Sequence, residues 1–453
     1  MLKLIKKQSS ETEKTEDWII LCQREDKEKK DVYFSMNDRL HHEYFAGQND
    51  TWKSAIILNQ VLEDIKAWNG FCFIDQYWDY TEEILKNFPK DRINDLIYID
   101  FSNTEYPIWI NILNEAKNPE ETDMITNNII NMFLDMYGPE TFWPRLQDYV
   151  RNICYILIEN NLYSWNSWKH TLFDIIKMIT QDLSAFMFHD IKNPVVNYRW
   201  TGTYTKMSDA DKADIIPFLQ AKLSPLFTES YVRNVLLQPE SSIDFSETVN
   251  ENKIILCNLA RWIVWNLNSE VIWRILMMEM NMVLPRRARM EESSIKPYFL
   301  YLDWFQDYVW WSFGDFLLNA TRYKIWVTMF NQYITPFKKE LTTWSLDLLQ
   351  SIFNITGTIW SFRIWGLDAE ILERFFSPKF SKNELKQLEN NTMIMKKYGD
   401  GSYAQPILCR VKKYVENIEN TPKKIEVIKE ISALKWWNKK EIVDKEISYR
   451  VMV

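Results

Sequence analysis

Residues 40–59 of the chain, LHHEYFAGQNDTWKSAIILN, place a polar loop between two apolar segments. The segment before the loop, Tyr44–Ala46, is typical of a buried strand, and the segment after it, Ala55–Leu62, is typical of a helix. The loop itself, residues 47–54, has the sequence GQNDTWKS. A phosphate-binding loop has the pattern G-x-x-x-x-G-K-S between a strand and a helix. The match is complete except at Trp52, where the pattern has glycine.

Trp52 conflicts with phosphate binding. The backbone N–H groups of such a loop wrap a phosphate, so the residue before the lysine must have almost no side chain. An indole would fill the phosphate site. Two interpretations of the loop stay open: a nucleotide-binding loop with one altered residue, or an ordinary polar loop before a helix.

The composition offers a reason for the mismatch, because tryptophan is frequent and glycine is rare. The chain has 21 Trp and 9 Gly in 453 residues, whereas an ordinary protein carries about 7% Gly. Some bacteria translate the UGA codon as glycine, and a gene from one of them, translated with UGA as tryptophan, would show this imbalance. We hypothesise that most of these tryptophans are glycines in the native protein. The alternative is a genuinely Trp-rich surface.

Many of the tryptophans lie among turn-forming residues, whereas tryptophan is normally buried among apolar side chains. Examples are Trp68-Asn69-Gly70, Tyr77-Trp78-Asp79, the segment 164–168, Trp365-Gly366 and the segment 435–438. Each becomes an ordinary turn when glycine replaces tryptophan.

Length and composition predict a globular protein of two or three domains. With 26% charged and 46% hydrophobic residues, no run of 18 apolar residues and no signal peptide in residues 1–30, we expect a cytoplasmic protein without a transmembrane segment. The net charge of −8 argues against a generally basic nucleic-acid coat but leaves a local basic channel open. The five cysteines show no metal-binding spacing with the four histidines.

Strand and helix patterns alternate on both sides of the loop. A hairpin is expected from Trp18–Cys22 and Val32–Met36, and buried strands at Phe71–Asp75 and Leu96–Phe101 flank a helix around Glu82–Asn87. This order predicts an α/β fold with a mainly parallel sheet and right-handed crossovers.

Helical periodicity replaces the strand pattern in the middle of the chain. Strands return at Lys253–Asn258, Tyr298–Asp303, Ile325–Phe330 and Gly357–Arg363. We therefore expect five parts: a hairpin region (1–34), a first nucleotide-binding part (35–113), an all-α insertion (114–236), a second nucleotide-binding part (237–409) and a charged tail or short helices (410–453).

The strand Tyr298–Asp303 ends in an acidic residue. P-loop enzymes use such a carboxylate to hold Mg²⁺ against the phosphates. Asp303 is therefore the candidate metal ligand, and a cap at the strand end is the alternative. Water activation usually needs a second carboxylate next to it, but this chain has Trp304 there.

In this order the motifs resemble the coupling ATPases of type IV secretion and conjugative DNA transfer, the TraD/TraG-type relatives of the HerA and FtsK translocases. Matching stretches include Asp38–His42, Phe73–Asp79, Trp143–Leu146, Leu256–Trp262, Phe299–Phe316 and Asn331–Tyr333, and the resemblance covers residues 35–410. The family carries glycine at Trp52, Trp78, Trp143, Trp262 and Trp365, which supports the recoding hypothesis. The resemblance implies a RecA-like P-loop nucleotide-binding domain interrupted by an all-α domain.

The resemblance also implies a site for ATP and Mg²⁺. The nucleotide would bind at Gly47, Gln48, Asn49, Asp50, Thr51, Trp52, Lys53, Ser54 and Ala55. Lys53 would neutralise the β- and γ-phosphates, and Ser54 and Asp303 would hold Mg²⁺. Gln332 would sense the γ-phosphate, and Arg322, with Arg363 as second choice, would be an arginine finger that reaches into a neighbouring subunit. Trp304 stands where the family has its catalytic glutamate, so Gln306 or a carboxylate from elsewhere would position the water.

We therefore expect an ATP-driven DNA translocase that forms a hexameric ring on single- or double-stranded DNA. It would act in the cytoplasm, docked at the inner face of the membrane, with a relaxase and secretion-channel proteins as partners. Two alternatives are a non-hydrolysing structural or regulatory relative and a HerA/FtsK-like DNA-packaging motor. Arg286, Arg287 and Arg289 could face DNA or form a solvated basic loop. The methionine run at residues 277–282 is typical of helix packing.

Overall fold

A computed structural model describes residues 18–25, 30–163, 168–180, 191–204, 206, 208–264, 266–305, 313–334, 343–399, 402–412 and 422–452. Within these residues twelve strands form one sheet in the order β2-β1-β12-β10-β9-β3-β8-β7-β4-β6-β5, and β11 pairs with β10. The strands are β1 (Trp18–Arg24), β2 (Asp31–Ser35), β3 (His42–Ala46), β4 (Gly70–Asp75), β5 (Leu96–Asp100), β6 (Ile254–Asn258), β7 (Tyr298–Asp303), β8 (Ile325–Asn331), β9 (Thr356–Ser361), β10 (Thr392–Gly399), β11 (Ser402–Tyr403) and β12 (Ile407–Val411).

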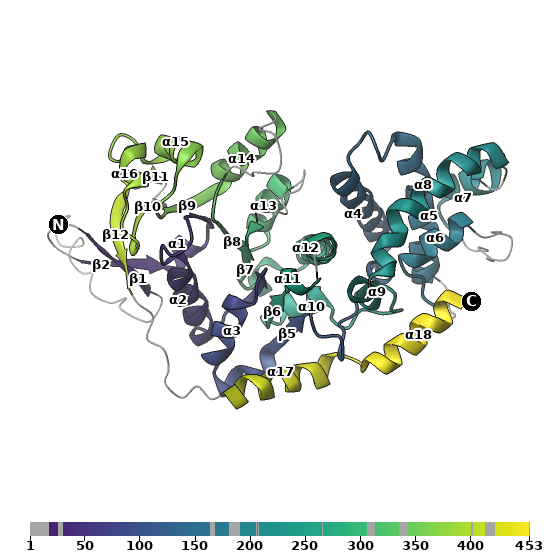
Figure 1. Ribbon diagram of the computed structural model, residues 1–453, viewed down its shortest axis with the longest axis horizontal. Coiled ribbons are helices and arrows are strands. Elements are labelled where there is room, and N and C mark those ends of the chain that lie inside the picture. Colours follow the sequence, from purple (N-terminus) through teal and green to yellow (C-terminus); the bar gives the residue numbers. More distant parts are fainter. Residues whose placement is uncertain are drawn as a thin grey trace, which may run out of the picture.

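The strands from β9 to β5 are parallel to one another, and the strands beyond β9 are antiparallel. Parallel neighbours need long crossover connections, and helices supply them here (Figure 1). The predicted α/β fold with a mainly parallel sheet is thus confirmed. The strands β10, β11 and β12, which we did not predict, extend the antiparallel edge toward the hairpin of β1 and β2.

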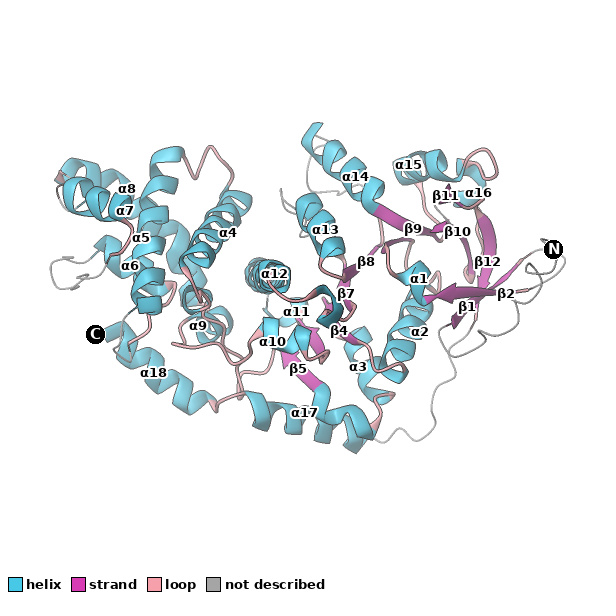
Figure 2. Cartoon of the chain, turned by 180° about the vertical axis from the view of Figure 1, so that it is seen from behind, coloured by secondary structure: helices cyan, strands magenta, loops and turns pink. Residues whose placement is uncertain are grey.

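Helices cover both faces of the sheet and also form a separate group beyond its β5 edge (Figures 1 and 2). They are α1 (Met36–Arg39), α2 (Lys53–Lys66), α3 (Asp79–Lys86), α4 (Pro119–Tyr137), α5 (Pro144–Tyr163), α6 (Phe173–Thr180), α7 (Pro194–Arg199), α8 (Asp209–Thr228), α9 (Ser230–Leu236), α10 (Phe245–Asn250), α11 (Arg261–Val264), α12 (Asn266–Ala288), α13 (Phe313–Arg322), α14 (Thr343–Ile355), α15 (Gly366–Phe376), α16 (Lys382–Lys386), α17 (Pro422–Trp436) and α18 (Lys440–Met452).

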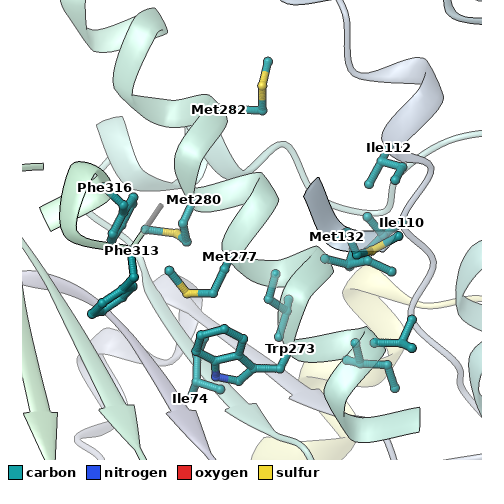
Figure 3. Packing of buried hydrophobic residues seen from close by; sticks show 14 of the residues in the cluster. Ile74, Ile110, Ile112, Met132, Trp273, Met277, Met280, Met282, Phe313 and Phe316 are labelled. Carbon is teal, nitrogen blue, oxygen red and sulfur yellow. The ribbon is translucent and has the colours of Figure 1, made fainter. Parts of the chain in front are cut away.

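The central strands are apolar throughout because both of their faces are buried. Side chains alternate between the faces of a strand, so Phe71 and Phe73 of β4 belong to the core beneath α2 and α3, while Cys72 and Ile74 belong to the core beneath α12 and α13. Figure 3 shows Ile74 beside Trp273, with methionines of α12 close by. Those methionines are buried, as expected for helix packing.

The C-terminal helices follow the lower edge of the molecule in Figure 1. Helix α17 lies against β5 and α3, and the Ser432 hydroxyl accepts the N–H of Tyr98 at 2.8 Å. Helix α18 contacts the helical group, where the guanidinium of Arg450 lies 4.6 Å from the centre of the Trp168 ring. Among the helices described, none combines the length and apolar character needed to cross a bilayer.

Candidate nucleotide-binding site

The loop between β3 and α2 lies at the carboxyl ends of the parallel strands. Its first N–H groups extend the sheet: Gly47 donates to the Asn331 carbonyl at 3.2 Å and Gln48 donates to the Arg363 carbonyl at 3.1 Å. A Cβ atom at Gly47 would lie 2.5 Å from the Cβ of Phe362. The loop therefore starts at a position that only glycine fits.

Lys53 is the first residue of α2 and only 8% exposed. Its Nζ donates to the carbonyl oxygens of Gly47 at 3.1 Å and Asn331 at 2.7 Å. Burial lowers the pKa of Lys53 to about 8, and the negative charge of Asp303 opposes that shift. A phosphate would offer this ammonium a charged acceptor in place of two neutral carbonyls.

Tryptophans around the site have an unusual backbone conformation. Trp52 and Trp78 precede α2 and α3 with φ of 69° and 68°, and Trp304 follows Asp303 with φ of 49°. This left-handed region costs a residue with a Cβ atom roughly 1–2 kcal/mol, whereas glycine enters it freely. At these three positions the backbone has the conformation that glycine favours.

Two buried carboxylates end neighbouring strands. Ile74 pairs with Leu302, so Asp75 and Asp303 are the next residues of β4 and β7. Burial raises the pKa of Asp303 well above its usual range, Asp75 raises it further, and Lys53 opposes the rise. Burial likewise raises the pKa of Asp75 to about 6, against hydrogen bonds from the turn that follows it.

The loop and the acidic edge enclose a cavity of about 1030 Å³. Its lining includes the predicted site residues Gln48, Asn49, Asp50, Thr51, Trp52, Lys53, Ser54, Ala55, Asp303 and Gln332, together with Asp75 and Tyr80. The Gln332 amide donates to the Asn49 side chain, and the hydroxyls of Ser54 and Tyr80 lie 3.0 Å apart. Residues that are far apart in the sequence thus meet at one cavity.

The two arginine candidates lie at different places. Arg322 is exposed at the end of α13, just before β8 begins, and therefore at the sheet edge opposite the cavity. Arg363 follows β9 beside the loop and donates to the Leu388 carbonyl at 3.4 Å. Within one chain, Arg322 does not reach the cavity. Gln306 lies outside the described residues.

We did not include Asp75 and Tyr80 among the predicted site residues. A signal for Asp75 was present, because the apolar strand before it ends in a carboxylate just as the strand before Asp303 does. Tyr80 shows no such pattern, since it contacts Ser54 only through the placement of α3 beside α2.

A parallel sheet with a lysine-containing loop at its carboxyl edge and an acidic residue on a nearby strand defines the class of RecA-like P-loop folds. Solved structures confirm it. The chain is similar to the plasmid coupling protein TrwB in complex with the GTP analogue GDPNP (TM-score 0.60, 11% identity, 86% of this chain and 90% of that chain). It is also similar to VirB4 of Thermoanaerobacter pseudethanolicus (TM-score 0.60, 11% identity, 91% and 99%).

TrwB has also been solved with ADP and Mg²⁺, and that structure matches with a TM-score of 0.56 and 10% identity over 85% of this chain and 89% of that chain. No protein-family model and no curated protein sequence matches the chain. The predicted resemblance to conjugative coupling ATPases is therefore confirmed at the level of the fold.

Proposed function

We propose that the native protein is an ATP-driven DNA translocase that resembles the coupling proteins of type IV secretion and conjugation. The observation that carries the proposal is the single cavity lined by Lys53, Ser54, Asp303 and Gln332. TrwB, which has this fold, has been solved with nucleotides and with Mg²⁺. In the native protein, residue 52 would be glycine.

The residues at the cavity suit Mg²⁺ and a polyphosphate. The Ser54 hydroxyl and the Asp303 carboxylate are oxygen donors, which Mg²⁺ prefers. They would hold the ion, which neutralises charge on the phosphates. Lys53 would exchange its two carbonyl acceptors for phosphate oxygens, and Gln332 would contact the γ-phosphate. Trp52 is the one loop residue that does not fit, because its side chain stands where backbone N–H groups must approach a phosphate.

Ring assembly would place Arg322 at a neighbour's site. Its exposed position at the opposite sheet edge suits a contact between subunits and not one within the chain. We propose a hexamer on DNA, in the cytoplasm and docked at the membrane through secretion-channel partners and a relaxase.

One observation favours a second candidate, a non-hydrolysing structural or regulatory relative. Trp304 follows Asp303 directly, and an indole can donate a hydrogen bond but cannot accept a proton. A HerA/FtsK-like packaging motor would have the same site but other partners, so genes for a relaxase and channel components next to this one would favour conjugation.

The test is ATP hydrolysis by the Trp52→Gly protein with and without DNA. We expect hydrolysis that DNA stimulates and that depends on protein concentration, since rings assemble by mass action. Arg322→Ala should abolish hydrolysis and leave ATP binding intact. A monomer that binds ATP and shows no DNA-stimulated hydrolysis would contradict the translocase and favour the non-hydrolysing relative.

A further inference from the structure

Hydrolysis at this cavity needs a group that accepts the proton of the attacking water, and position 304 offers none. Within the part of the chain that the structure describes, five acidic residues line the cavity. Asp50 and Asp79 are exposed, and Glu83 forms an ion pair within α3. Asp303 is the carboxylate that would hold the metal. Among the described residues this leaves Asp75, which is fully buried and lies next to Asp303 on the neighbouring strand.

The Asp75 carboxylate is held in a fixed orientation. Its Oδ1 accepts the N–H of Tyr77 at 3.1 Å and its Oδ2 accepts the N–H of Thr81 at 2.8 Å. An ionised carboxylate has about four acceptor positions. These two bonds leave at least one acceptor position of the carboxylate unfilled. Among the residues that the structure describes, no lysine, arginine or histidine forms an ion pair with Asp75.

We infer that Asp75 is the general base of ATP hydrolysis, a role that rests on the proposed nucleotide site. The water oxygen forms a bond to the γ-phosphorus while the bond from that phosphorus to the bridging oxygen breaks, and its electron pair leaves with ADP. The water proton passes to the Asp75 carboxylate, which releases it to solvent after phosphate departs. Asp75 thus supplies the function that the glutamate after Asp303 would otherwise supply.

The opposing explanation is structural: Asp75 merely anchors the turn before α3. Asp100 provides a matched control, because it ends β5 at the same edge of the sheet and its Oδ1 accepts the N–H of Ser102 at 3.0 Å, yet it does not line the cavity. A purely anchoring carboxylate at either position should affect stability more than turnover.

The experiment compares Asp75→Asn, Asp75→Glu and Asp100→Asn in the Trp52→Gly protein, with kcat for ATP and the ATP dissociation constant as readouts. General bases contribute about 10²–10⁴-fold. We expect Asp75→Asn to lower kcat at least about 100-fold with the dissociation constant within about 3-fold of the parent, Asp75→Glu to recover part of the rate, and Asp100→Asn to match the parent.

An unchanged kcat for Asp75→Asn would overturn the inference. A parent protein that binds ATP without hydrolysing it would also overturn the inference. The proposed nucleotide site would still be supported in that case. A parent that fails to bind ATP would overturn the proposed function instead. If Asp75→Asn does not fold, the folded Asp75→Ser protein should regain hydrolysis when formate is added, and no recovery in a variant that binds ATP would refute the role.

Discussion

Tryptophans occupy two contrasting regions of this molecule, the core of the sheet and the rim of the candidate nucleotide cavity. In the core, Trp360 of β9 is fully buried and stacks on Phe45 with 5.1 Å between the ring centres. Its indole N–H donates to Glu43 at 2.9 Å. Here the indole contributes apolar burial, aromatic stacking and a hydrogen bond.

At the rim of the cavity the tryptophans are not fully buried, although Trp304 packs edge-on against Tyr77 with 5.2 Å between the ring centres. Trp52, Trp78 and Trp304 share a left-handed backbone, and Trp52 is 39% exposed. Trp68 lies away from the cavity, at the turn between α2 and β4, and it too has a positive φ, of 59°, and is 54% exposed. Tryptophan therefore fills two kinds of position in this chain. We propose that the core positions are tryptophan in the native protein and the left-handed positions are glycine.

The largest expected effect lies in the core. Trp360→Ala removes a buried aromatic ring and should lower the free energy of unfolding by about 3–5 kcal/mol. Trp262, which is 73% exposed, is the control, and Trp262→Ala should change stability by less than about 0.5 kcal/mol. Denaturant unfolding measures both. Equal, small effects would remove the distinction between the two regions.

At the rim, Trp52→Gly should raise ATP affinity by at least about 100-fold, or about 2.7 kcal/mol, because the loop amides can then approach a phosphate. Nucleotide titration of the altered and unaltered chains measures the change. Lys53→Ala in the altered chain should remove most of the gain. Tight and equal binding by the unaltered chain would mean that the indole does not obstruct the loop.

A second test of the core concerns Glu43, the buried carboxyl group that accepts the indole N–H of Trp360. Burial raises the pKa of Glu43 from 4.5 to about 7. Between about pH 4.5 and 7, Glu43 is protonated in the folded state and ionised in the unfolded state. The stability that the protonated carboxyl contributes is complete below pH 4.5 and is lost as the pH rises through 7. Glu43→Gln keeps an acceptor for Trp360 and does not titrate. At pH 8 we expect the variant to be more stable than the parent by about 3 kcal/mol, and at pH 4 to be equally stable. Urea unfolding measures both proteins. If their free energies of unfolding differ by the same amount at pH 4 and at pH 8, the pKa shift of Glu43 is disproved.

The smallest effect concerns the exposed turns, where a matched pair is available. Trp68 and Trp365 are 54% and 57% exposed, but their φ angles are 59° and −129°. Trp68→Gly should stabilise the fold by about 0.5–1 kcal/mol, since relief of the left-handed strain exceeds the entropy that glycine adds to the unfolded chain. Trp365→Gly relieves no strain and should destabilise. Thermal unfolding measures both variants. If Trp68→Gly and Trp365→Gly shift the melting temperature in the same direction, the argument from backbone conformation is contradicted.

Features of the fold could be predicted from the sequence where they depend on residues close together in the chain. The loop and the strands β3, β4 and β7 were predictable because apolar runs and loop residues are local patterns. The sheet order was not, so Asp75 stayed outside the predicted site although it lies beside Asp303. Strands β10 and β12 were missed although they pair with each other across a short connection; their other partners are β9 and, far away in the chain, β1.

The three arginines Arg286, Arg287 and Arg289 also have partners that a local sequence pattern could not predict. Sequence suggested either a DNA-facing surface or a solvated loop, and neither is found for two of the three arginines. Arg286 donates to Glu121 at 3.0 Å, and Arg287 is buried and donates to the carbonyls of Val249 and Tyr323. These partners are at least 36 positions away in the sequence, so composition alone did not reveal them.

The most direct measurement of the central claim is the coding sequence of the gene. Codons 52, 68, 78 and 304 specify the left-handed positions, and codons 273 and 360 specify fully buried rings. We predict UGA at the first four and UGG at the last two, with glycine found at residue 52 by peptide mass analysis of the protein from its own host. UGG at codons 52 and 78 would contradict the account, because those tryptophans would then be genuine.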